Sequence, residues 1–250
     1  GGRPRGVWVG ICGQAKLAAP KGGWYASAMA KPGDLDQALN NLFEAERRLR
    51  ALHDDVADSE PMALLEAIAK ALGQANKESD ANEASLRLER LAALLGEMDS
   101  ARAVDLLIDI LNSDPPDARS AAGEQLEGLS FDRFKEVARG VERALKRLPK
   151  GSPALPEIPY LLAEVPEPGV TKLLEQFLEH EDADAVAAAI EVAVEVGDAT
   201  ITKRLEKLTE DKRTVEMSDE NDDTAEVTLG ELALDALDIF ASMDEEDDEP

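Results

Sequence analysis

GVTKLLEQFLEHEDADAVAAAIEVAVEVGD (Gly169–Asp198) is the stretch of sequence that decides the fold. It divides at an acidic turn into two segments, each with apolar residues at the spacing of a helix. The first segment places apolar residues at steps of three and four, which predicts one stripe along a helix. These residues are Val170, Leu173, Leu174, Phe177 and Leu178. The second stripe consists mostly of alanine and valine, whose small side chains let a helix lie close to two neighbours. The stretch therefore predicts a helix pair that needs further helices to cover it.

The same pattern occurs 67 residues earlier in the chain. Leu106 aligns with Leu173, Asp117 with Asp184, and Ala122 with Ala189. This offset is close to two periods of about 34 residues, and periods of about 20–50 residues are typical of solenoid proteins. Between the two copies we expect one more helix pair, over Phe131–Leu148 and Leu155–Val165. A further pair is expected from Ile201 onwards, with its second helix delayed by an acidic insertion.

The two stretches Ala103–Leu129 and Val170–Asp198 resemble HEAT repeats. The turn of that family carries an aspartate followed by an aliphatic and a basic residue, and Asp117, Ala118 and Arg119 follow this pattern. The later stretch keeps Asp184 but has no basic residue in its turn where the family has one, and the usual proline of the first helix is missing. The resemblance implies an all-α fold, a right-handed α-solenoid of stacked antiparallel helix pairs with a concave face that binds partners. It implies no reaction.

Four regions are expected along the chain. Residues 1–33 hold eight of the seventeen glycines, both tryptophans, five basic residues and no acid, and are predicted to be a flexible leader or the remnant of a tag. Residues 34–98 are predicted to form a helical capping bundle whose first helix carries Leu35, Leu39, Leu42, Leu49 and Leu52, with Asp34 as its N-cap. Residues 99–243 are predicted to hold the repeats. The acidic insertion 209–226 and the tail 244–250 are predicted to be disordered.

The composition narrows the choice of partners. A net charge of −26 makes nucleic acid an improbable general partner, because phosphate binding depends on lysine and arginine. No apolar run reaches the 18 or more residues of a membrane span, so we expect no membrane partner. The single cysteine, Cys12, cannot form an internal disulfide, and this agrees with a cytoplasmic location.

The sequence carries no recognisable motif for catalysis, a metal or a cofactor. Asp219, Asn221 and Asp223 resemble the start of a calcium loop, but Thr224 stands where the loop needs glycine. His180-Glu181 resembles one of the four His-Glu pairs of the HEAT-like iron hydroxylases. The chain has only two histidines, so it cannot supply four such pairs. We therefore expect no catalytic residues, no metal and no cofactor. An enzyme of unrecognised type is the weakest alternative.

The expected helix Phe131–Leu148 is the most informative segment for function. Its apolar residues Phe131, Phe134, Ala138, Val141, Leu145 and Leu148 predict a core stripe. Its basic residues Arg139, Arg143, Lys146 and Arg147 are a candidate site for an acidic or helical segment of another protein, and the first, second and fourth are four residues apart. The alternative is a solvated face whose charges are balanced by neighbouring acidic helices.

Two further hypotheses concern the ends of the chain. Trp8 and Trp24 of the leader could dock into a groove, on this chain or on another. The acidic tail could compete with a polyanion or a phosphorylated partner for the basic residues, although a role in solubility is the simpler account. The function expected from the sequence is that of a non-catalytic scaffold or adaptor for protein–protein interaction.

Overall fold

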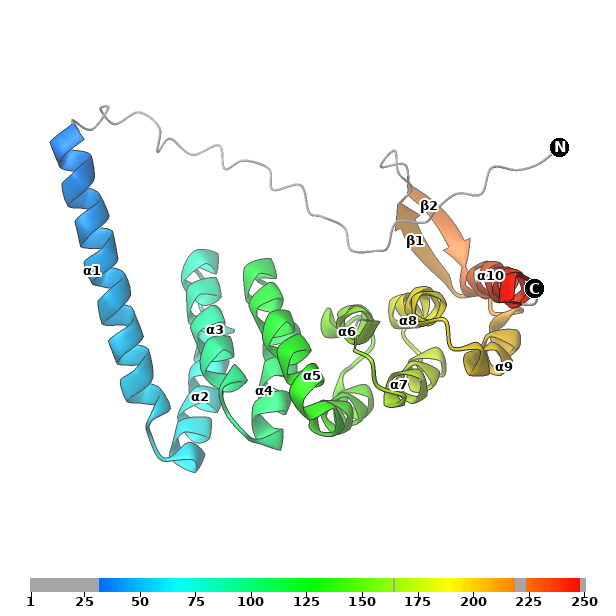
Figure 1. The fold of residues 1–250 in the computed structure, drawn as a ribbon, viewed down its shortest axis with the longest axis horizontal. Coiled ribbons are helices and arrows are strands. Elements are labelled where there is room, and N and C mark those ends of the chain that lie inside the picture. Colours follow the sequence, from blue (N-terminus) through cyan, green and yellow to red (C-terminus); the bar gives the residue numbers. More distant parts are fainter. Residues whose placement is uncertain (1–31, 164, 219–223, 248–250) are drawn as a thin grey trace. The chain divides into compact units, whose positions relative to one another are not determined.

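The computed structural model describes residues 32–163, 165–218 and 224–247, which form helices and one small sheet (Figure 1). The longer helices are α1 (Pro32–Ala57), α2 (Pro61–Ala75), α3 (Ala81–Gly96), α4 (Ala101–Leu111), α5 (Pro116–Arg147), α6 (Ala154–Ala163), α7 (Gly169–Leu178), α8 (Ala183–Val196) and α10 (Leu229–Asp247). Between α8 and α10 lie the short helices η1 (Ala199–Ile201), α9 (Thr202–Leu205) and η2 (Glu206–Leu208), and then the strands β1 (Thr214–Ser218) and β2 (Thr224–Thr228). The chain is therefore mostly helical, as the sequence predicts.

The described residues fall into two compact units, 32–67 and 68–247, with the boundary inside α2. In the larger unit each helix packs against helices close to it in the sequence: α3 against α4 and α5, α5 against α6, and α8 against α6, α7 and α10. The core of this unit is therefore a succession of contacts between sequence neighbours.

The two helix pairs predicted from the 67-residue offset bury equivalent positions. Four apolar residues of α4 that the offset aligns with α7 are buried, and so are the four residues of α7 that align with them. They are Leu106, Leu107, Ile110 and Leu111 of α4, and Leu173, Leu174, Phe177 and Leu178 of α7. In the second helix of each pair, Ala122 and Ala189 are both fully buried. The apolar spacing therefore identified the correct core residues in both pairs.

Helix α5 covers two predicted helices and bends where they meet. Arg133 has φ −140° and ψ 45°, outside the helical region, so that the segments before and after it are two helices joined at a kink. The predicted core stripe of the second segment is only partly right. Val141 and Leu148 are buried, but the Phe131 side chain is 52% exposed, and Phe134, Ala138 and Leu145 are half-buried. Burial begins after the kink, with Val137, Val141, Ala144 and Leu148. The kink turns the helix, and an apolar spacing that assumes a straight helix cannot account for that turn.

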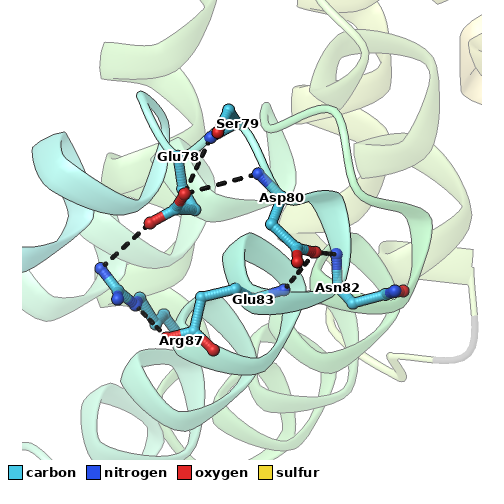
Figure 2. A network of polar contacts seen from close by, with 6 residues as sticks. All are labelled: Glu78, Ser79, Asp80, Asn82, Glu83 and Arg87. Carbon is cyan, nitrogen blue, oxygen red and sulfur yellow. Dashed lines mark hydrogen bonds and ion pairs between the residues drawn. The ribbon is translucent and has the colours of Figure 1, made fainter.

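The start of α3 is held by a polar network (Figure 2). Asp80 is the N-cap, and its Oδ1 accepts hydrogen bonds from the backbone N–H groups of Asn82 (2.9 Å) and Glu83 (3.3 Å). The Glu83 side chain pairs with Arg87 at 2.7 Å, and Arg87 also reaches Glu78 at 3.6 Å. The cap satisfies N–H groups that have no partner inside the helix. The sequence therefore fixes the first residue of α3 through local polar chemistry.

The acidic insertion contains a β-hairpin, so the prediction of disorder for 209–226 is wrong over the strands. β1 and β2 pair antiparallel, with Val215 opposite Val227 and Met217 opposite Ala225. Val215 and Met217 are buried, while Thr214 before them and Glu216 between them are exposed. This alternation is the pattern of a strand with one buried face. The acids of the two strands, Glu216 and Glu226, lie on exposed positions, and the number of acids in the segment hides the alternation in a count of composition.

Both ends of the described chain also differ from the predictions. Helix α10 continues to Asp247, so the predicted boundary of a disordered tail at Asp244 is wrong for its first four residues. Helix α1 begins at Pro32, which places Asp34 in its first turn and not at the N-cap. The leucines predicted to define this helix lie within it, but Leu35, Leu39, Leu42 and Leu52 are 42–61% exposed. Among the described helices, none combines the length and apolar character needed to cross a membrane.

Candidate functional site

The basic residues of the second half of α5 divide into two groups. Arg139 and Lys146 are exposed, and neither forms an ion pair with any residue in the described part of the chain. They are seven residues apart in one helix, which places them on the same face. Lys135, four residues before Arg139, is exposed as well.

The second group pairs with the acidic side of α4 and the residues before it. Arg143 binds Asp105 at 2.8 Å, Arg147 binds Asp109, and Arg133 binds Asp99. The same arginines also donate to backbone carbonyl oxygens: Arg133 to Met98 (2.9 Å), Arg143 to Ala101 (3.4 Å) and Arg147 to Asp105 (3.2 Å). We call these three ion pairs the arginine ladder. It links the second half of α5 to the preceding helix.

The candidate site therefore differs from the line of arginines expected from the sequence. Arg143 and Arg147 are held against α4, although the Arg143 side chain remains 42% exposed. Arg139 and Lys146 carry the charge that is available to a ligand. Exposed ion pairs contribute about 0–1 kcal/mol each to stability, so the ladder positions side chains more than it stabilises the fold.

Arg119, in the first turn of α5, has a different role from these residues. Its guanidinium donates to the carbonyl oxygens of Ser113 (3.2 Å) and Asp114 (2.8 Å) and pairs with Glu157 of α6 at 2.8 Å. Burial raises the pKa of Glu157, and Arg119 opposes this shift. Arg119 thus closes its own turn and also connects that turn to α6.

An open, acid-lined cavity of about 650 Å³ lies beside the hairpin. Its lining includes Asp184 at the start of α8, Glu216 of β1 and Glu226 of β2. Burial raises the pKa of the Asp184 carboxyl, the negative charges of Asp182 and Glu216 add to the shift, and Lys150 opposes it. No group of three or more potential ligands in the described residues has a geometry suited to a metal ion. Trp8 and Trp24 lie outside the described residues.

The sequence identified the basic residues, and its alternative of a charge balanced by a neighbouring acidic helix holds for Arg143 and Arg147, although the sequence did not name the acids. The ladder contacts span 34 to 38 residues in the sequence, so they depend on how α4 and α5 pack. The sequence did contain one indication of these partners. Asp105 and Asp109 are four residues apart in α4, as Arg143 and Arg147 are in α5, and equally spaced acids and arginines can pair when the two helices lie side by side.

No protein-family model matches the chain, and no curated protein matches it. Two solved structures are similar, and both are crystal structures of engineered proteins from the Northeast Structural Genomics Consortium. They are 20% and 16% identical to this chain, and each comparison covers 76% of this chain and 89% of the other, with a TM-score of 0.33. A score at this level carries no argument about fold or function.

Proposed function

We propose that the chain is a non-catalytic scaffold built as a right-handed, HEAT-like α-solenoid. In this proposal it binds an acidic segment of another protein through Arg139 and Lys146. A solenoid offers an extended surface on which a partner segment makes many modest contacts.

The recurrence of burial at an offset of 67 residues is the observation that carries this proposal. Aligned positions of α4 and α7 are buried alike, and so are Ala118 and Ala185 in the helices that follow them. Packing between sequence neighbours, from α3 to α10, is what a stack of repeats requires. Arg119, the basic residue of the HEAT-like turn, binds the carbonyl groups of that turn, which also supports the resemblance.

The choice of Arg139 and Lys146 follows from where the other basic residues of α5 are bound. Arg139 and Lys146 are exposed, lie on one face of α5 and form no ion pair with a described residue. The arginine ladder occupies the acids of α4 that lie nearest to α5. Carboxylates of a partner are therefore the groups that Arg139 and Lys146 can bind, and arginine can do so with two parallel hydrogen bonds.

Affinity capture from a lysate of the source organism tests this proposal. The intact chain is compared with the double variant Arg139→Glu/Lys146→Glu and with the control Lys203→Glu/Lys207→Glu. Lys203 and Lys207 are also exposed and form no ion pair with a described residue, so the control changes the net charge equally. Arg143 and Arg147 are left unchanged because their reversal would place two like charges against Asp105 and Asp109.

The expected result is an acidic protein that the intact chain and the control retain and the double variant loses. Circular dichroism of all three proteins should show equal helicity. Equal capture by all three would contradict the site on α5. Loss from both variants would show that total charge governs binding, without a defined site.

A further inference from the structure

Helix α1 carries a seven-residue repeat of apolar residues. Leu35, Leu42, Leu49 and Val56 recur every seven residues, and Ala38, Ala45 and Leu52 follow the first three of them after three residues. Steps of three and four sustained over three heptads are typical of a helix that pairs with another along its whole length. In coiled-coil notation the first set occupies positions a and the second set positions d.

The structure shows that this repeat lies on one unbroken helix and remains accessible. Helix α1 runs for 26 residues, a length of about 39 Å. Leu35 is 54% exposed, Leu42 61% and Leu52 52%. In proteins most of the stability of a helix comes from the packing of its apolar face against other elements. An apolar face of this extent is typical of an interaction site.

We propose that a second copy of this chain covers this face, with the two α1 helices antiparallel. Leu42 then lies opposite the partner subunit's Ala45, and Ala38 lies opposite the partner subunit's Leu49. In the four central layers a leucine meets an alanine, so these layers fill similar volumes. Leu35 meets the partner subunit's Leu52 at each end of the contact.

A parallel pair would fit this sequence less well. It would place Ala38 and Ala45 each against its own copy, and an alanine layer between leucine layers leaves a gap. In the antiparallel register Arg48 lies beside the partner subunit's Asn41, so no like charges meet near the centre. Asp34 and the partner subunit's Asp55 meet only at the ends, where solvent and salt screen them.

The size of the contact sets the expected affinity. A strip about 39 Å long and about 10 Å wide gives a footprint on the order of 400 Å² per copy. This is smaller than the roughly 800 Å² per partner of a standard interface, so we expect a dimer that dissociates in the micromolar range. The dimer is independent of the proposed scaffold function, because it uses none of the residues of α5.

Sedimentation equilibrium of the full chain between 1 and about 200 μM tests the proposal. The intact chain should pass from monomer to dimer, and Leu42→Glu should stay monomeric at least tenfold higher in concentration. Leu86→Glu is the matched control, because Leu86 is a leucine of α3 with 57% exposure, and it should behave as the intact chain. An intact chain that is monomeric throughout overturns the proposal. If the α1 amides of that monomer resist hydrogen exchange at every concentration, another part of the same chain covers the apolar face of α1, and the proposal is overturned as well.

The orientation is tested with a spin label at position 54. In a Cys12→Ser background, Asp54→Cys places the label on the outer side of α1. In the antiparallel register residue 54 lies opposite residue 33 of the partner, so the two labels are separated by about 30 Å along the axis. A parallel pair would bring them side by side, and a label distance near 10–20 Å in the dimer would overturn the antiparallel arrangement.

Discussion

At Gly140 the backbone of α5 passes close to a side chain of α4. A Cβ atom at this position would lie 2.5 Å from Cγ1 of Val104, which is fully buried and, as a β-branched residue, has little rotamer freedom. We expect Gly140→Ala to lower the free energy of unfolding by about 1–3 kcal/mol, as overpacked cores do. Gly128→Ala is the control, because nothing lies within 4 Å of its added Cβ. It should raise stability by about 0.5–1 kcal/mol. Urea unfolding of both variants measures the contrast, and equal effects would contradict the close approach.

Also at the scale of the residue, Thr171 links α7 to the turn after α8. Its hydroxyl donates to Oδ2 of Asp198 at 2.7 Å, and this bond, with those from Thr200, lowers the pKa of Asp198. A lowered pKa in the folded state stabilises the fold above the unfolded pKa of about 3.9, and the contribution is lost as the pH falls through the folded pKa. Thr171→Val should therefore cost at most about 1 kcal/mol at pH 7. The cost should shrink below pH 4. Urea unfolding at pH 7 and pH 3 checks this, and a pH-independent cost would contradict it.

At the scale of the element, the arginine ladder predicts a measurable coupling between α4 and α5. In a double-mutant cycle of Arg143→Ala and Asp105→Ala, we expect a coupling free energy of about 0.2–1 kcal/mol. It should fall in 1 M NaCl, where the Debye length is about 3 Å. The cycle of Arg139→Ala with Asp105→Ala is the control and should show no coupling. A coupling of equal size in both cycles would show that the contact between Arg143 and Asp105 has no special role.

The hairpin is the second element that allows a direct test. Met217 is 1% exposed, whereas its neighbour Glu216 is exposed to solvent. Met217→Ala should cost about 2–5 kcal/mol, the range for truncating a buried methionine. Glu216→Ala should change stability by less than about 0.5 kcal/mol. Guanidinium unfolding gives both values, and hydrogen exchange shows whether the β1–β2 amides lose protection first. A small effect of Met217→Ala would contradict a hairpin anchored by its buried face.

Elements also show how far the sequence predicts this fold. Leu106, Leu173 and their helical neighbours were identified as core residues because their spacing is local information. Val215 and Met217 were missed because the acids between and around them dominate the composition. The exposure of Phe131 depends on the kink at Arg133, and the pairing of Arg143 depends on the packing of two helices. The sequence pattern therefore did not predict the contacts between distant segments that shape the candidate site.

At the scale of the whole molecule, the imbalance of charge predicts how salt affects stability. Even if all 27 basic residues were paired, 26 of the 53 acidic residues would keep no basic partner. Their mutual repulsion disfavours the compact state, and salt screens it. Salt also weakens the arginine ladder, but exposed pairs contribute only about 0–1 kcal/mol each, so the repulsion should dominate. We expect the thermal midpoint to rise between 10 and about 200 mM NaCl, as the Debye length falls from about 30 Å to below 10 Å. Sucrose at equal osmolality is the control for effects other than screening. A midpoint that falls with NaCl would mean that the ion pairs outweigh the repulsion among the unpaired acids.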